Sequence, residues 1–172
     1  MKTASPPERS ADWPTLLLGG LAAFAAYFAM YAFRKPFAAA TFEGASGWSF
    51  ALDYKSALLI AQVLGYALSK FIGIRVVAEF GRHGRAKAIL ALIGISWVAL
   101  LLFPVLPAPW TLAALFLNGL PLGMIWGLVF SYVEGRRSSE LLGAMLCASF
   151  ILASGVTKTV ATWIMQAGVA EP

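Results

Sequence analysis

Residues 109–133 read PWTLAALFLNGLPLGMIWGLVFSYV, and none of them is charged. A helix needs about 20 consecutive, predominantly apolar residues to cross the hydrocarbon core of a bilayer. This stretch is long enough, and similar apolar blocks occur at about 14–34, 54–78, 87–106 and 139–166. Because a span in lipid must satisfy its own backbone hydrogen bonds, each block is predicted to be an α-helix. We therefore expect an all-α integral membrane protein with five transmembrane helices.

The composition of the whole chain agrees with this interpretation. Of the 172 residues, 60% are apolar and 12% are charged, and the mean hydropathy is +0.77. Soluble domains have roughly 45–50% apolar and about 25% charged residues. These values exclude a disordered chain and most soluble enzymes. A single cysteine, Cys147, excludes a disulfide scaffold, and we expect it to be packed as a small apolar residue. We expect two parts: a polar cytoplasmic tail, 1–12, and a helical bundle, 13–172.

The net charge of +5 is interpreted as a topology signal rather than as a nucleic-acid surface. The basic residues of two short connections are Arg75, Arg82, Arg85 and Lys87, and then Arg136 and Arg137. The connection at 104–109 has no charge. Since basic loops stay on the cytoplasmic side, the amino terminus is predicted to be cytoplasmic and the carboxyl terminus external. Ending after five spans also suggests that the chain is a fragment.

Three cations, Arg34, Lys70 and Lys158, fall within or at the ends of the apolar spans. A cation at the centre of a span costs roughly 2.5–3.5 kcal/mol on insertion scales. One interpretation is that each side chain reaches the headgroups from near a helix end. The other is that the three face a shared cavity, which would then bind an anion.

Polar residues accompany these cations. Gln62, Tyr66 and Lys70 are four residues apart and share one face of a helix. Asn118 adds an amide to the 109–133 span, and Ser154 lies four residues before Lys158. We therefore predict a wet, cation-lined interior.

Small residues form two ridges at i+4 spacing: Gly65, Ser69 and Gly73, and then Gly119, Gly123 and Gly127. Such ridges let another helix approach closely. Their expected role is helix packing in a compact bundle. Pro121, in the second of these helices, is expected to bend it.

Signatures of catalysis and of cofactors are missing from the sequence. His83 is the only histidine and is expected in a cytoplasmic loop, so a Ser/His protease inside the bundle is excluded. The sequence has no His-Glu-x-x-His motif, no Cys/His cluster and no Walker loop. We expect neither an enzyme nor a metal or organic cofactor.

Three segments resemble a known transporter family. They are YAFRKPFAAA at 31–40, GYALSKFI at 65–72 and GMIW at 123–126. They resemble the amino-terminal half of major facilitator superfamily transporters, particularly the organophosphate:phosphate antiporter branch. The stretch SYVEGRR at 131–137 is more similar to an uncharacterised bacterial side family of that superfamily.

The resemblance implies roles for particular residues. Arg34 would help to bind the substrate phosphate, Lys70 would lie at the cavity, and Lys35 would contribute less. The superfamily has a Gly-x-x-x-Asp-Arg-x-Gly-Arg loop after its second span. Here the spacing is stretched, and Glu79 stands for the aspartate, which implies a gating loop of Glu79, Arg82 and Arg85.

The leading hypothesis is therefore the amino-terminal part of a six-helix superfamily bundle, truncated before helix six, in a bacterial inner membrane. It would move a small anion, phosphorylated if the resemblance holds, by alternating access. The expected binding residues are Arg34, Lys35, Gln62, Tyr66, Lys70, Asn118 and Lys158. Its partners would be the lipid bilayer, the solute, and a carboxyl-terminal half or partner subunit. The alternatives are a transporter-like membrane sensor and a structural membrane subunit.

Overall fold

The computed structural model describes residues 13–32, 34–42, 47–79, 82–133 and 139–169. Within these residues the protein is all-α, as predicted. Its elements are α1 (Trp13–Ala32), the short 3-10 helix η1 (Pro36–Ala39), α2 (Tyr54–Glu79), α3 (Arg82–Leu102), α4 (Thr111–Val133) and α5 (Ser139–Gln166).

Four of the helices have the length and apolar character of membrane spans. The apolar stretches are Tyr54–Val76, Gly84–Leu102, Thr111–Tyr132 and Glu140–Gln166, and α1 contributes a shorter one, Leu16–Ala32. Large apolar side chains such as Phe71, 76% exposed, and Leu18, 72% exposed, lie on the outer surface. Lipid tails cover such side chains without the cost of exposing them to water. The chain is therefore an integral multi-pass membrane protein whose helices contact the bilayer.

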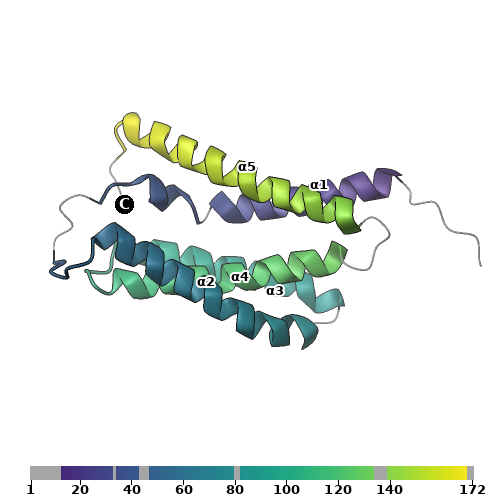
Figure 1. Ribbon diagram of the computed structural model, residues 1–172, viewed down its shortest axis with the longest axis horizontal. Helices are drawn as coiled ribbons and strands as arrows, with labels where there is room; N and C mark the ends of the chain where they lie inside the picture. Colours follow the sequence, from purple (N-terminus) through teal and green to yellow (C-terminus); the bar gives the residue numbers. More distant parts are fainter. Residues whose placement is uncertain (1–12, 33, 43–46, 80–81, 134–138, 170–172) are drawn as a thin grey trace, which may run out of the picture.

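The helices form two layers (Figure 1). One contains α1, η1 and α5, and the other contains α2, α4 and α3. Within them, α1 packs on α5, while α4 is covered by α2 and α3. A core cluster joins the two layers, with Tyr27 and Tyr31 from α1, Leu122 and Ile125 from α4, and Leu146 from α5.

The two predicted ridges of small residues pack against each other. A Cβ atom added to Gly65 of α2 would collide with the backbone carbonyl of Phe116 in α4. One added to Gly119 of α4 would collide with the backbone carbonyl of Gln62, and one on Gly123 with the Ser69 hydroxyl. The backbones of α2 and α4 are thus in direct contact, which brings the polar residues of both helices together.

One end of the bundle is closed by an apolar cluster. α2 starts at this end because the Asp53 carboxylate accepts hydrogen bonds from the Ser56 backbone N–H and hydroxyl, at 2.9 and 3.0 Å. The Tyr54 hydroxyl donates to the Thr111 hydroxyl at 2.7 Å and links α2 to α4. The cluster contains Phe37, Tyr54, Leu58, Phe103, Ala114 and Leu115.

Two predictions need correction. The third span, expected at 87–106, is the helix Arg82–Leu102, so His83 and Lys87 lie in its first turns instead of in a loop. Hydropathy marks where a helix leaves the apolar core, whereas the backbone hydrogen bonds continue beyond that point. Cys147 is exposed, not packed, because it lies on the outward face of α5. The predicted tail, 1–12, lies outside the described residues.

Candidate functional site

A series of hydrogen bonds crosses the interior from α3 to Arg34, which follows α1. The Asn118 side chain donates to the Ser96 backbone carbonyl at 3.1 Å, and the Gln62 amide donates to the Asn118 side-chain oxygen at 2.8 Å. The Gln62 side-chain oxygen in turn faces Nε of Arg34 at 3.5 Å. Asn118 and Ser96 have no exposed surface, and Gln62 is 3% exposed. Because these buried groups satisfy one another's hydrogen-bonding capacity, the hydrogen bonds fix the orientation of the Gln62 side chain toward Arg34.

The Tyr66 ring lies beside two positive charges. The guanidinium carbon of Arg34 is 4.7 Å from the ring centroid, and Nζ of Lys70 is 4.8 Å from it. Tyr66 and Lys70 are one helical turn apart on α2, whereas Arg34 follows the end of α1. The structure thus brings together the cations of two segments around a single aromatic ring. The π face of a ring attracts a cation within about 6 Å of its centroid.

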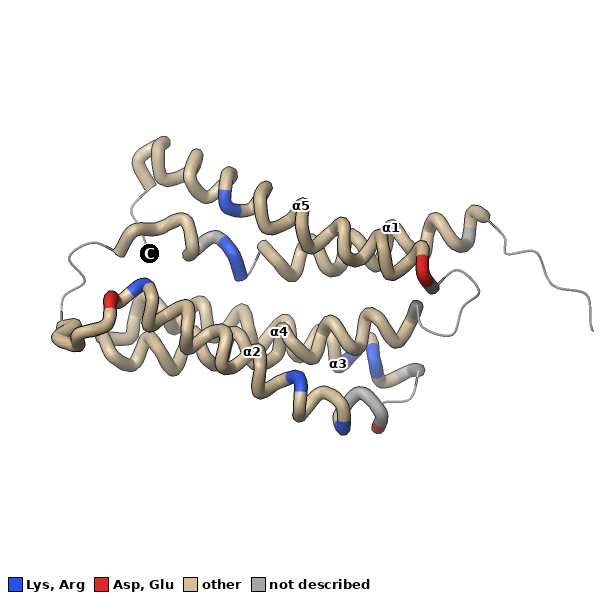
Figure 2. The backbone as a smooth tube through the Cα atoms, viewed as in Figure 1, with Lys and Arg blue, Asp and Glu red and all other residues tan. Residues whose placement is uncertain are grey.

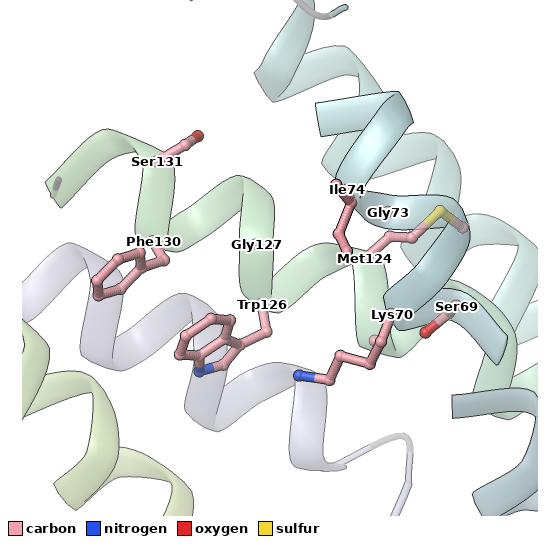
Figure 3. Close-up of a pocket in the computed structure, with 10 residues that line it drawn as sticks. Ser69, Lys70, Gly73, Ile74, Met124, Trp126, Gly127, Phe130 and Ser131 are labelled. Carbon is pink, nitrogen blue, oxygen red and sulfur yellow. The ribbon is translucent and has the colours of Figure 1, made fainter. Parts of the chain in front are cut away.

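Lys70 also lies against α4. Its Nζ is 4.8 Å from the Trp126 ring centroid, and Figure 3 shows the side chain extending from α2 toward Trp126. The ammonium group therefore lies between two aromatic rings.

A pocket of about 260 Å³ opens beside Lys70, between α2 and α4 (Figure 3). Its lining residues are Ser69, Lys70, Gly73, Ile74, Gly123, Met124, Trp126, Gly127, Phe130 and Ser131. Three of them are glycines, so the backbone itself forms part of the wall. Lys70 is the one charged residue in this lining.

Lys35 and Lys158 extend the positive region from the Arg34 side. Lys35 immediately precedes η1, which packs against α5, the helix that carries Lys158. The Lys35 ammonium is repelled by the charges of both Arg34 and Lys158. Lys158 is exposed, and near it Thr157 donates to the carbonyl of Ala153 in its own helix. These lysines add to the field around Arg34, whereas Gln62, Tyr66, Lys70 and Asn118 form the connected part of the predicted set.

The described residues provide no carboxylate partner for Arg34 or Lys70. The acids among them, Asp53, Glu79 and Glu140, stand at the ends of α2 and the start of α5, while basic residues also occur along the helices (Figure 2). Arg34 is half-buried and Lys70 is exposed on the surface of this bundle. A cation within a membrane span is costly, and a bound anion would offset that cost.

The predicted gating residues lie apart from this cluster. Glu79 is the last residue of α2 and is exposed. Arg82 begins α3, and its side chain lies outside the described part of the chain. Arg85 donates to the Ser131 carbonyl at 3.1 Å, so it ties α3 to the carboxyl-terminal end of α4, where a cation is favoured.

Sequence reasoning missed the aromatic neighbours. Tyr31 lies 2% exposed, with its ring centroid 5.9 Å from the Arg34 guanidinium carbon. Trp126 contacts Lys70 from another helix. Tyr27 and Tyr31 are four residues apart, which marks one helix face, but that spacing does not indicate which cation lies above it.

Comparison with known proteins places the chain in one family. Residues 36–172 match a family of unknown function (DUF5690), and the chain belongs to that family. No curated protein and no solved structure matches it.

Proposed function

We propose that this chain is the amino-terminal bundle of a secondary transporter of the major facilitator type, and that it binds a small anion between Arg34 and Lys70. The observation that carries the proposal is the convergence of these two cations on Tyr66 without a carboxylate partner among the described residues. The resemblance of residues 31–40 and 65–72 to the organophosphate:phosphate antiporter branch supports it independently.

The two cations suit different parts of an anion. A guanidinium group has five N–H donors in a planar fork, and the Nε of Arg34 lies 3.5 Å from the Gln62 side-chain oxygen. Its remaining donors can bind two oxygens of a phosphate or carboxylate together. Lys70 adds a compact charge with three donors. At an effective dielectric of about 20, each cation about 4 Å from the anion contributes about 4 kcal/mol of Coulomb attraction.

Transport by this mechanism requires a second bundle. In transporters built of repeats, the halves rock around a site near the middle of the membrane. The second bundle would come from a carboxyl-terminal half of the same transporter or from a partner subunit. The amino terminus would be cytoplasmic, in a bacterial inner membrane.

The binding step is tested by calorimetric titration of the purified protein with inorganic phosphate in neutral nanodiscs. Arg34→Gln and Lys70→Gln are each expected to weaken binding about 10- to 150-fold, since a hydrogen bond to a charged group contributes about 1.5–3 kcal/mol. Arg75→Gln and Lys87→Gln are the controls, because both residues are exposed and lie outside the cluster. Equal losses in all four variants would show only a general charge effect and would refute the site.

Transport is tested separately. Phosphate flux into proteoliposomes that contain the protein with its second bundle should disappear in the Arg34→Gln variant. Binding without any flux in the unmodified protein would favour the sensor alternative over the transporter.

A further inference from the structure

The pocket beside Lys70, at about 260 Å³, is larger than an inorganic anion needs. From its walls we infer that the solute is a compact anion with an apolar, ring-sized body, such as an aryl carboxylate or an aryl phosphate. The inference rests on the proposed anion site and specifies what the anion is attached to.

The walls of the pocket are apolar and partly aromatic. The rings of Trp126 and Phe130 stack in parallel on α4, with their centroids 5.0 Å apart and an interplanar angle of 5°. Ile74 and Met124 line the pocket from α2 and α4. Aromatic and aliphatic walls around one charged group are the usual lining of a site for a small organic molecule.

The two hydroxyl groups of the pocket are already occupied as donors. Ser69 donates to the Tyr66 carbonyl at 2.6 Å, and Ser131 donates to the Leu128 carbonyl at 2.6 Å. The remaining side-chain donors of the lining are the Lys70 ammonium, which the anionic group needs, and the single indole N–H of Trp126. The hydroxyl groups of a sugar or glycerol phosphate would lose their water without gaining equivalent partners, and this costs affinity. The pocket therefore favours an apolar body over a polyol.

The volume limits the size of that body. A cavity of about 150 Å³ lined by apolar side chains accepts benzene, so about 260 Å³ accommodates one ring with a short charged group. Drug-sized ligands occupy pockets of about 300–1,000 Å³, so the part of the solute that this bundle holds is about one ring in size.

Lys70 connects the pocket to the cation cluster around Tyr66. Its Nζ lies 4.8 Å from the Trp126 ring centroid, at the pocket and within reach of the Tyr66 ring that also faces Arg34. An anionic group held by these cations would place its attached ring against Trp126 and Phe130.

The test is calorimetric titration, in neutral phosphatidylcholine nanodiscs, of three probes: phenyl phosphate, glycerol 3-phosphate and inorganic phosphate. Phenyl phosphate is expected to bind at least tenfold more tightly than the other two. In Trp126→Leu the ratio of phenyl to inorganic phosphate affinity should fall at least fivefold. The ratio is used because Trp126 also contacts Lys70. Trp97→Leu is the matched control, since Trp97 is 51% exposed on α3 and lies outside the pocket.

The outcomes separate this inference from the proposed function. Equal affinities for the three probes, or an unchanged ratio in a folded Trp126→Leu protein, would overturn the apolar body while leaving an anion site. If Trp126→Leu does not fold, the preference of the unmodified protein decides alone. Failure of every probe to bind would refute the anion site itself. Loss of phenyl phosphate binding on adding phosphatidylglycerol to the nanodiscs would identify a lipid headgroup as the natural anion and overturn the soluble solute.

Discussion

Tyr66 is the residue at which the contacts of the candidate site meet. Its ring faces Arg34 from one segment and Lys70 from its own helix, both at less than 5 Å from the centroid. Each cation–π contact contributes about 0.5–2 kcal/mol, depending on how far water is excluded. The ring thus offsets part of the mutual repulsion of the two charges without neutralising them, so both remain available for an anion.

Replacing Tyr66 should separate the roles of the ring and of the hydroxyl. Tyr66→Phe keeps the π face and is expected to change phosphate affinity less than threefold. Tyr66→Leu removes both cation–π contacts, so the two cations are positioned less firmly. Phosphate affinity should then fall about 5- to 30-fold, which corresponds to a loss of about 1–2 kcal/mol of binding free energy. Titration of both variants in nanodiscs measures this. An equal loss in both variants would show that the hydroxyl, not the ring, organises the site.

The sequence predicted part of this site because helical periodicity is regular. The spacing of Gln62, Tyr66 and Lys70 requires one shared face, and the structure has them along one side of α2. The sequence did not reveal that Trp126 faces Lys70 or that Asn118 faces Gln62. Those pairs depend on the rotation and depth of α4 relative to α2, which a single sequence does not encode at any fixed spacing.

At the scale of the element, the packing of α2 on α4 determines where these side chains meet. The glycines at the interface leave no space for a Cβ atom, and the collisions would be with backbone, which cannot move aside as a side chain can. The position of Lys70 relative to Trp126 is therefore sensitive to substitutions that never touch either residue.

Gly65→Ala should destabilise the bundle although alanine is the better helix former. The new methyl group would meet the Phe116 carbonyl and force the helices apart, at a cost of about 1–3 kcal/mol for overpacking. Gly155→Ala is the matched control, because no atom lies within 4 Å of its Cβ position, and it should be neutral or stabilising by up to about 1 kcal/mol. Thermal unfolding in detergent measures both. Equal stability of the two variants would contradict the close contact.

Element boundaries were predictable to the extent that membrane and helix boundaries coincide. The second and fifth spans, expected at 54–78 and 139–166, are Tyr54–Glu79 and Ser139–Gln166. Asp53 caps α2 where the apolar block begins, so the two boundaries agree there. They differ at α3, whose first turns are basic. η1 was not predicted, since a helix of four residues is too short to give a hydropathy signal of its own.

The whole molecule has two unlike ends. The apolar cluster around Tyr54 and Phe103 fills the end where α2 and α4 begin, while the pocket is lined by the later parts of both helices. Arg75, Arg85 and Lys87 stand toward that second end. Under the proposed function, a solute would enter from this basic end, which the positive-inside rule predicts to be cytoplasmic.

This orientation predicts which positions an impermeant thiol reagent reaches in intact cells. In a Cys147→Ser background, Ser49→Cys should react from outside, because Ser49 is exposed in the segment before α2, at the apolar end. Glu140→Cys, exposed in the first turn of α5, should react only after the membrane is permeabilised. The unaltered Cys147→Ser protein controls for background labelling. The reverse labelling pattern would place the basic end outside the cell, in contradiction to the charge bias that retains lysine and arginine on the cytoplasmic side. In that case the proposed solute would enter the pocket from the exterior.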